Sequence, residues 1–527
     1  MFGRFVSATL IVLIGFWHYG CASRILGVFP IPSMSHQSVF RGLTLALRER
    51  GHELVVVTTD PVNNPNLANY TEIDVNFLYG NFEDVNWIVN REKKVTSSTF
   101  ESFSEQFHAQ CEGILSHPEL KKLYAPDSGE KFDLLLVEMF YHPSLYPLAT
   151  RFQAPIIGVS SMGLNFNVQY AIGNPIMPSH PSNWDPEQKF TGKLTLWQRI
   201  KNFAWTWKYL YDYSRTYMPV QRAIASKYFG NDIPDISEIE KNISLVLVNQ
   251  QAPIAYLRPN VPKMIDFGGF HIAKKMKPMS KDLQKILDDS TQGFIYMSLG
   301  SKVKSAMLSD ERRAEFIAAF AKLPYTVIWK FEDELLPNQP PNVLIMKWTP
   351  QQAILAHPNL KLFIYHGGLQ STEEAVSHGV PVIGLPVFAD QDVNTGKMAS
   401  LGVGIKLEIL TVKRDELLEA INTVVSDTSY KKRMMDLRNL IKDKPYDSME
   451  NAIWWTEHVI RHKGAPYLQS TTADEPWYQL QDMDIVFILS AGSLVTLSFV
   501  LVVFYKLLIS SFSASNKLPA SKKDKLN

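Results

Sequence analysis

The chain has 527 residues, too many for one hydrophobic core, so we expect two domains with additional segments. Its 53 lysines and arginines nearly balance 52 aspartates and glutamates, which gives a formal net charge of +1. This balance provides no electrostatic basis for binding nucleic acid. The chain holds only two cysteines, which excludes a disulfide-rich secreted scaffold.

The N-terminal residues are typical of a secretory signal peptide. An apolar stretch at 5–16 follows a basic start, and the small residues at 20–23 are typical of a cleavage site. We predict that residues 1–23 form the signal peptide and that its removal also removes Cys21. Cys111 then remains as the one cysteine of the mature chain, so no intrachain disulfide can form.

The first predicted unit is a strand, a helix and a second strand. Residues 24–29 indicate a buried strand, a loop at 30–38 leads into an amphipathic helix, and 53–59 indicate the next strand. We expect His36 on the loop at the carboxyl end of the first strand, where open α/β sheets place their ligands. A single histidine in a loop is usually structural or solvated, so its position alone makes His36 a candidate general base and no more.

A carboxylate partner for His36 is predicted further along the chain. Residues 131–139 indicate a strand that ends in a buried acid, Glu138. A carboxylate beside an imidazole fixes its tautomer and stabilises the proton that it takes up. We therefore interpret Glu138 as the partner of His36.

An irregular, aromatic-rich segment lies between these two residues in the sequence. It covers 69–124 and contains Trp87, Phe100, Phe103 and Phe107. We interpret it as helices and loops that cover a binding pocket.

A second aromatic-rich segment has apolar residues at helical spacing from Trp197 to Leu210, with Arg199, Lys201 and Lys208 on the other side. One interpretation is an interfacial helix that dips into a membrane surface and admits apolar ligands laterally. The other is an ordinary amphipathic helix packed on the domain core, and we favour it slightly.

A proline-rich stretch separates the two predicted domains. Residues 245–249 indicate the last strand of the first domain, which we place at 24–262. The stretch 252–263 contains three prolines and leads into the linker. The second domain is predicted at 263–445.

The second domain carries polar and aromatic residues at the ends of its predicted strands. A strand at 291–301 ends in Ser301, and another ends at Trp348, whose indole can stack on a nucleobase. Gln351 follows and can hydrogen-bond a base or a ribose. The carboxyl ends of parallel strands share one crevice, so we expect these side chains to lie near each other.

The most informative stretch begins with a buried strand at 362–365. His366 and Gly368 lie in the turn after it, and Ser371 and Glu374 lie in the first turns of the following helix. The start of a helix offers unpaired N–H groups and the positive end of the dipole, which suit a phosphate, and glycine lets the backbone approach closely. Glu374 can accept paired hydrogen bonds from the two hydroxyls of a ribose.

A short strand at 382–385 follows, and the loop after it presents Asp390 and Gln391. An acid and an amide side by side can bind two or more sugar hydroxyls. The stretch therefore predicts a nucleotide-sugar site. The alternative is an ordinary strand–helix–strand unit whose polar residues only cap helices.

The C-terminal segments predict a membrane anchor. Residues 446–481 contain a helix and a juxtamembrane stretch, and 485–505 are uncharged and long enough, at about 1.5 Å per residue, to cross a bilayer core of about 30 Å. The tail at 506–527 is rich in lysine, which predicts a cytosolic tail and a lumenal body. Sequons at Asn69 and Asn242 fit a lumenal body.

The last five residues, KDKLN, carry lysines three and five places from the end. They are similar to the dilysine address of endoplasmic reticulum membrane proteins. A basic tail that is attracted to anionic lipid is the alternative.

The stretch from His366 to Gln391 resembles the signature of the UDP-glycosyltransferases, the membrane-bound detoxifying enzymes of animals. The segment around His36 is similar to the start of the same family. The resemblance covers nearly the whole chain and is weakest from about 63 to 234. It implies an α/β fold of GT-B type, with two Rossmann-like domains facing across a cleft, and a helix at 448–461 that crosses back onto the first domain.

The resemblance implies a role for each matching residue. In the family the loop histidine is the catalytic base and an acid, usually Asp, is its partner, and these positions are His36 and Glu138 here. Tyr365 stands where the family usually has Ser or Thr. The residues that match the family's contacts with the UDP-sugar, including the turn at the start of the helix, are Ser301, Trp348, Gln351, His366, Gly368, Ser371, Glu374, Asp390 and Gln391.

The implied reaction is an inverting transfer of a hexose from a UDP-sugar to a hydroxyl of a small lipophilic acceptor. His36 would remove the acceptor proton and Glu138 would stabilise the imidazolium, with no metal and no cofactor. In the family, invertebrate members use glucose and vertebrate members glucuronate. No cluster of arginines for a carboxylate accompanies the motif, so we expect UDP-glucose, with UDP-glucuronate as the alternative. Membrane lipid is an expected partner, and the oligomeric state stays open.

Two further interpretations compete with this one. Paired sheets would suit an oxidoreductase, but no G-x-G-x-x-G follows a first strand, and Gly402-Val403-Gly404 lacks the third glycine. A non-catalytic binding protein of the same fold is suggested by Tyr365 and Glu138. Release of UDP with a panel of phenols would decide between enzyme and binding protein.

Overall fold

The chain is described here by a computed structural model that divides into two compact units, Met1–Ser470 and Thr471–Asn527. The structure describes residues 22–82, 85–93, 100–184, 194–273, 276, 278–473 and 475–515. Nearly all of the predicted signal peptide, the terminal lysines of the tail and the side chain of Phe100 lie outside the described residues.

The first unit contains two parallel sheets. The first sheet has the strand order β3-β2-β1-β4-β5-β6-β7, and its order reverses between β1 and β4. Its strands are β1 (Arg24–Phe29), β2 (Glu53–Thr58), β3 (Tyr70–Asp74), β4 (Leu134–Glu138), β5 (Ile156–Ser160), β6 (Leu245–Asn249) and β7 (Met264–Phe267). The inner strands are apolar except at their ends, because helices cover both faces of the sheet.

The second sheet has the order β10-β9-β8-β11-β12-β13, and its order reverses between β8 and β11. Its strands are β8 (Phe294–Ser298), β9 (Thr326–Lys330), β10 (Val343–Met346), β11 (Leu360–Tyr365), β12 (Val382–Gly384) and β13 (Gly404–Lys406). Both sheets are doubly wound, so the predicted pair of Rossmann-like domains is confirmed.

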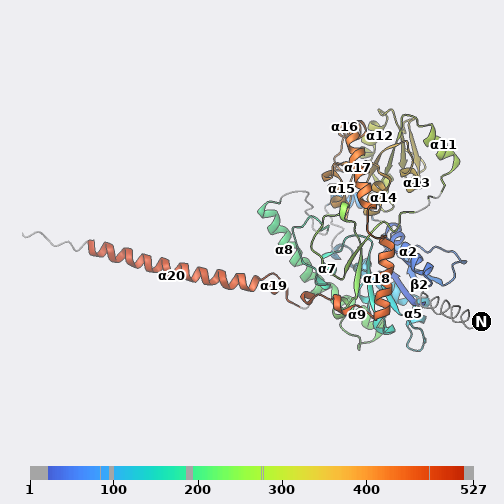
Figure 1. Cartoon of the computed structure of the whole chain (residues 1–527). Coiled ribbons are helices and arrows are strands. Elements are labelled where there is room, and N and C mark those ends of the chain that lie inside the picture. The colour runs from blue at the N-terminus through green and yellow to red at the C-terminus, as the bar shows by residue number, and fades with distance from the viewer. Residues whose placement is uncertain are drawn as a thin grey trace, which may run out of the picture. The chain divides into compact units, whose positions relative to one another are not determined.

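Helices enclose each sheet (Figure 1). With the first sheet go α2 (Met34–Glu49), α3 (Trp87–Glu92), α4 (Phe100–Ser116), α5 (Pro118–Tyr124), α6 (Pro147–Phe152), α7 (Phe166–Ala171), α8 (Leu196–Asp212), α9 (Met218–Phe229) and α10 (Ile236–Lys241). With the second go α11 (Lys281–Asp289), α12 (Asp310–Phe320), α13 (Gln351–Leu355), α14 (Leu369–His378), α15 (Gln391–Ser400), α16 (Arg414–Ser426) and α17 (Thr428–Lys442).

The helix α18 (Ser448–His462) returns to the first sheet, as the resemblance implied. It contacts α2 and β7, and its buried side chains Ala452, Ile453 and Val459 join the cluster formed by β1 and α2. Glu450 on its first turn pairs with Arg50 at the end of α2. The two sheets are therefore held together by the chain crossing between them twice.

Two predictions about the first sheet were wrong. The strand at 245–249 is not its last strand, because β7 pairs in parallel with β6. This edge strand has only four residues, of which one is buried, so its apolar run is too short to indicate a strand. His36 lies not on a loop but in the first turn of α2, which begins at Met34. Most residues of that turn are polar. The apolar periodicity from which we predicted the helix therefore begins several residues after the helix itself.

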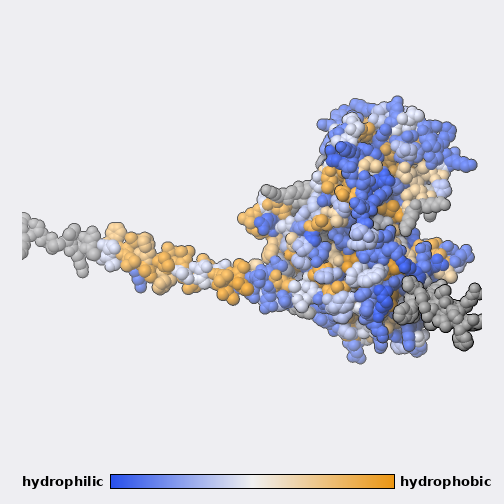
Figure 2. Space-filling model, in the orientation of Figure 1, coloured by the Kyte–Doolittle hydropathy of each residue, from blue (hydrophilic) through white to orange (hydrophobic). Residues whose placement is uncertain are grey.

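The helix α8 does not pack as the favoured interpretation predicted. Its buried residues are Asn202, Thr206, Tyr209 and Leu210, whereas Trp197 is 64% and Ile200 47% exposed. The Tyr209 hydroxyl donates to Asn167 Oδ1 at 3.0 Å, so the helix docks through a partly polar face. Its N-terminal apolar side chains face outward, where hydrophobic atoms gather at the position of α8 in Figure 2.

The second unit contains α19 (Trp477–Leu480) and α20 (Met483–Ser515). Within α20, Met483–Ser513 is long and apolar enough to cross a membrane, judged by length and composition. It includes the stretch predicted at 485–505.

Candidate functional site

The imidazole of His36 is held at the point where the first sheet reverses its strand order. α2 follows β1, and Glu138 is the last residue of the neighbouring strand β4. The Nδ1 atom of His36 lies 3.1 Å from Oε1 of Glu138. The other carboxylate oxygen of Glu138 accepts a hydrogen bond of 3.0 Å from the backbone N–H of Ile31. The carboxyl group thus fixes both the imidazole and the loop that precedes it.

Glu138 is buried, and His36 is 18% exposed at the side chain. Burial raises the pKa of Glu138, while the hydrogen bond with His36 lowers it. With Nδ1 engaged by Glu138, Nε2 is the ring nitrogen that remains for a substrate.

His366 occupies the corresponding point of the second sheet, after β11 and beside the turn after β8. Glycines make room for its ring: a Cβ atom at Gly300 would lie 2.6 Å from Cε1 of His366, and one at Gly368 would lie 2.6 Å from Nε2. Burial, together with the nearby charge of Lys330, lowers the pKa of His366 to about 3. The ring is therefore neutral and donates from one nitrogen only.

Gly368 is the N-cap of α14 and has no side chain that could accept a hydrogen bond from the first turn. Gln370 and Ser371 on this turn line the same cavity as His366. Backbone N–H groups at the start of a helix have no partner within the helix, so this turn can donate to an anion.

Gln351 organises the polar residues of α14. Its Nε2 donates to Ser371 Oγ at 2.9 Å and to Glu374 Oε2 at 2.6 Å, and its Oε1 accepts from the hydroxyl of Tyr296 at 3.1 Å. The second oxygen of Glu374 accepts from Gln352 at 2.9 Å. We predicted a direct contact of Gln351 with a base or ribose. The structure shows that its amide already orients Ser371 and Glu374.

Asp390 and Gln391 lie at the start of α15. The Oε1 atom of Gln391 accepts from the backbone N–H groups of Val387 and Phe388 at 2.8 and 3.1 Å, which closes the loop before the helix. Asn394 donates to Asp390 Oδ2 at 2.8 Å. The side-chain carbonyl oxygen of Gln391 is therefore already engaged by backbone N–H groups of the protein.

Trp348 is 57% exposed and presents its ring to the cavity. The ammonium of Lys330 lies 5.5 Å from the centre of this ring. Ser301 follows Gly300 on the turn after β8 and is exposed. Tyr365 points away from the site, because its buried hydroxyl pairs with Thr372 Oγ1 at 3.0 Å.

One cavity of about 580 Å³ joins the two halves of the site. Of the predicted site residues, those that line it are His36, Ser301, Trp348, Gln351, His366, Gly368, Ser371, Glu374, Asp390 and Gln391. Glu138 lies behind His36. Trp87, Phe103 and Phe107, which we predicted around a binding pocket, line the cavity too. Among the described residues no group of three or more His, Cys, Asp or Glu side chains is arranged to hold a metal ion.

Sequence reasoning missed several lining residues, notably Lys302, His271 and Phe388. Lys302 and Phe388 are near neighbours of residues that we predicted, which is the one signal that could have indicated them. Burial lowers the pKa of Lys302 to about 8. His271 follows the missed strand β7, and nothing in the local pattern distinguishes it.

Comparison with known proteins decides the class of this site. The family described as UDP-glucoronosyl and UDP-glucosyl transferase matches residues 25–517. The chain belongs to this family. It is therefore a UDP-glycosyltransferase, and the implied transfer of a glucosyl or glucuronosyl group is the activity of its family.

The curated relatives of this UDP-glycosyltransferase span its length. UDP-glycosyltransferase UGT5 of Dactylopius coccus is 33% identical and covers 100% of both chains. UDP-glucosyltransferase 2 of the same organism is 35% identical over 95% of this chain and 96% of its own. UDP-glucuronosyltransferase 1A7 of Mus musculus is 29% identical over 92% of this chain and 91% of its own.

Solved structures show the fold. TcCGT1, solved in complex with UDP, has a TM-score of 0.57 at 16% identity and covers 84% of this chain and 100% of its own. CalG4, the calicheamicin glycosyltransferase, has a TM-score of 0.55 at 19% identity and covers 84% and 99%. The UDP-glycosyltransferase thus has the GT-B fold that the resemblance implied.

Proposed function

We propose that this UDP-glycosyltransferase transfers glucose from UDP-glucose to a hydroxyl of a small lipophilic acceptor, with inversion at the anomeric carbon. The observation that carries the proposal is that the His36–Glu138 pair and the residues from His366 to Gln391 line or adjoin one cavity. A single displacement needs a base and a leaving group on opposite sides of one sugar, and this cavity offers both.

His36 acts as the base in this proposal. Its Nε2 takes the proton of the acceptor hydroxyl as the oxygen attacks the anomeric carbon, and UDP leaves from the opposite side. Glu138 stabilises the imidazolium because its carboxylate already binds Nδ1. The reaction inverts the carbon because one displacement occurs.

The donor lies along the second sheet. Trp348 stacks on the uracil, Glu374 binds the ribose with Gln351 behind it, and Asp390 and Gln391 bind the sugar hydroxyls. Gln391 contributes its amide N–H₂, since its oxygen is used by the loop. Ser301 adds a hydroxyl from the turn after β8.

The diphosphate is bound at the first turn of α14 by backbone N–H groups and by the Ser371 hydroxyl. His366 adds one N–H, because a neutral imidazole has one donor. The helix dipole stabilises the charge that develops on the leaving UDP, so we propose that the reaction needs no metal and no cofactor.

Glucuronate remains the second candidate sugar, and one observation favours it. Lys302 brings an ammonium group to the cavity, and a carboxylate on the sugar could pair with it. No arginine lines the cavity among the described residues, so the bidentate partner that best suits a carboxylate is missing from this part of the chain. We therefore keep glucose as the proposal.

The acceptor faces an apolar wall. Aromatic side chains from the first domain, namely Phe82, Trp87, Phe103, Phe107, Phe140 and Trp184, line the cavity beside His36. Flat apolar molecules fit such a wall, so we propose small lipophilic alcohols or phenols as acceptors and detoxification as the role.

We propose that α20 anchors the enzyme in the endoplasmic reticulum membrane, with the catalytic body in the lumen and the lysine-rich tail in the cytosol. Asn69 and Asn242 are both exposed, as glycosylation in the lumen requires. We also propose that the exposed apolar side chains of α8 touch the lipid surface, so that membrane lipid is a partner of the body as well as of the anchor.

The donor assay tests the proposed function. We expect microsomes carrying the full chain to transfer radiolabelled glucose from UDP-glucose to a panel of phenols, at least about tenfold faster than glucuronate, since a site that binds a hydroxyl discriminates strongly against a mismatched group. Activity should persist in a chelator. Faster transfer of glucuronate would overturn the sugar assignment, and loss of activity that manganese restores would overturn the metal-free mechanism. UDP binding without any transfer would indicate a binding protein.

A probe on α8 tests the lipid contact. In the full processed chain in liposomes, a fluorescent label at Ile200→Cys should be quenched by nitroxide lipids, because position 200 is 47% exposed on the apolar side. The native Cys111 is buried and does not compete for the label. A label at Lys208→Cys, on the charged side of the helix, is the matched control. Equal quenching at both positions, or none at 200, would contradict the contact.

A further inference from the structure

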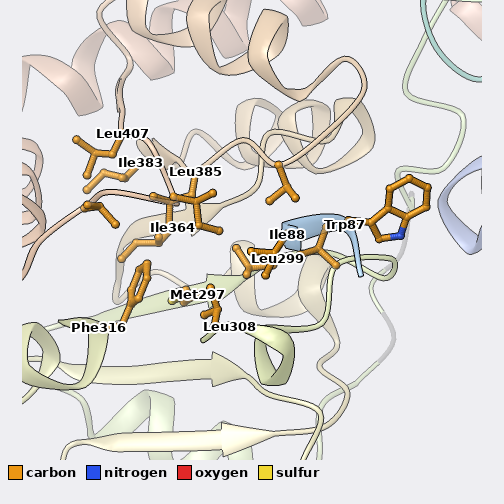
Figure 3. Close-up of a cluster of buried hydrophobic side chains, with 14 of the residues drawn as sticks. Trp87, Ile88, Met297, Leu299, Leu308, Phe316, Ile364, Ile383, Leu385 and Leu407 are labelled. Atoms are coloured by element: carbon orange, nitrogen blue, oxygen red, sulfur yellow. The ribbon is translucent and has the colours of Figure 1, made fainter. Parts of the chain in front are cut away.

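The helix α3 belongs to the first domain by sequence but is fastened to the second domain. Trp87 stacks on Phe388 with ring centroids 4.2 Å apart and an angle of 15° between the planes. Ile88 joins the apolar cluster of the second sheet, where it lies beside Leu299 (Figure 3). α3 therefore crosses the cleft, and its contacts connect the wall of the cavity with the loop that follows β12.

Arg91, one turn after Trp87, makes the polar part of this connection. Its Nε and Nη2 donate to the two carboxylate oxygens of Glu408 at 2.8 and 2.7 Å. Its Nη1 and Nη2 donate to the two oxygens of Asp392 at 2.9 and 3.2 Å. Nη1 also donates to the backbone carbonyl of Val387 at 3.2 Å. One guanidinium thus holds two carboxylates and a carbonyl of the other domain.

The groups that Arg91 binds mark both ends of the sugar-binding loop, which we define as residues 387–392 and which includes the first two residues of α15. Val387 begins the loop, Asp392 ends it, and Asp390 and Gln391 lie between them. Lys406 supports the same end, because its Nζ donates to Asp392 Oδ1 at 2.9 Å. The loop therefore has its two ends held from outside by one side chain of α3.

Loss of the ion pairs between Arg91 and the carboxylates of Asp392 and Glu408 would be energetically unfavourable, because these charges are partly buried. The Arg91 and Asp392 side chains are 17% and 11% exposed. Burial lowers the pKa of Arg91, but the hydrogen bonds to Glu408 and Asp392 outweigh it and raise the pKa above its ordinary value. Removing the guanidinium would take a bidentate cationic partner from the largely buried Asp392 carboxylate, although the ion pair with Lys406 would remain. The loop would then move to reduce the cost of the buried charge.

We propose that Arg91 is a positioning residue that sets the sugar-binding loop, so that the acceptor wall and the sugar contacts move as one body. The proposal rests on the proposed function of Asp390 and Gln391. Arg91 touches neither substrate: it acts through the loop. Because Trp87 lines the cavity and Arg91 holds the loop, an acceptor that seats against Trp87 stabilises the geometry that the sugar needs.

The test compares Arg91→Lys and Arg91→Ala with wild type in the full chain, using UDP and UDP-glucose as separate ligands. Lysine keeps the charge but not the fork that reaches three groups at once. We expect kcat/KM for UDP-glucose to fall by about 10- to 100-fold in Arg91→Ala, since displacing a reacting group by about 1 Å costs on the order of 10²-fold. The kcat/KM of Arg91→Lys should lie between those of wild type and Arg91→Ala. The affinity for UDP, measured by calorimetry, should change by less than about twofold, because the proposed UDP contacts lie outside the sugar-binding loop. The affinity for UDP-glucose should weaken at least about fivefold.

Arg222→Ala is the matched control, because Arg222 pairs with Asp235 on the surface, with side chains 47% and 46% exposed. It should leave both affinities and the rate unchanged. If Arg91→Ala does not fold, Arg91→Lys and Glu408→Gln carry the test, and each should lower the affinity for UDP-glucose more than that for UDP. If the Arg91 variants lost affinity equally for UDP and UDP-glucose, or lost affinity for neither, the proposal would be overturned. Absence of transfer in wild type would refute the proposed function, and the two affinities would still test the positioning role.

Discussion

Replacing His36 by alanine should reduce turnover by roughly 10²–10⁴-fold and leave the affinity for UDP unchanged. The reason is geometric: the imidazole lines the cavity, its Nδ1 is engaged by Glu138 at 3.1 Å, and Nε2 is left to take the acceptor proton. A microsomal assay with radiolabelled UDP-glucose measures the loss of turnover. Calorimetry with UDP measures the affinity.

His462→Ala is the control for this variant, because His462 is exposed at the end of α18, outside the residues that line the cavity. It should retain full activity. A His36→Ala enzyme that turns over as fast as wild type would eliminate His36 as the base. The second domain would then have to supply the base, and the role of the first domain would reduce to acceptor binding.

Replacing Glu138 by glutamine should cost turnover on a similar scale, about 10²–10⁴-fold, with little change in substrate binding. Glutamine is nearly the same size, so Ile31 N–H can keep its acceptor. If the amide N–H₂ then faces His36, Nδ1 becomes an acceptor and the proton moves to Nε2, the nitrogen that must be free to act as base. The variant also carries no negative charge to stabilise the imidazolium.

Glu138→Asp provides the graded comparison. It keeps the charge but shortens the side chain by one methylene, so it cannot hold His36 at 3.1 Å and Ile31 at 3.0 Å together without movement. We expect its rate to lie between wild type and Glu138→Gln, with a thermal unfolding curve close to that of wild type. A rate for Glu138→Gln equal to wild type would rule out the pairing as a catalytic device.

Most of the strands were predictable from sequence because each is a short apolar run between polar turns. β1 and β6 have the predicted ends, and β11 differs by two residues. Three strands were not predicted: β5, which lies inside the first sheet, and β3 and β7, which lie at its two edges. β3 and β7 carry exposed or partly exposed residues, because an edge strand is covered by fewer neighbours and needs no continuous apolar run.

The packing of α8 was not predictable in the same way. Its pattern shows an apolar side and a charged side, and we favoured burial of the apolar side. The structure buries Asn202 and Thr206 together with Tyr209 and Leu210, and the Tyr209 hydroxyl donates to Asn167. Helical periodicity defines which residues share a side, but the neighbouring elements determine which side is covered.

The sequence by itself determined the order of the elements, the apolar C-terminal helix and the set of polar residues after the strands, because each depends on neighbours within a few positions. Only the tertiary structure decided that His36 and His366 share one cavity, that Gln351 orients Glu374, and that Arg91 holds the loop of Asp390. Two of these relations join residues about 300 positions apart, and the third joins residues 23 positions apart on different elements. They follow from where two sheets reverse their strand order and how the domains pack, and no local pattern encodes those distances.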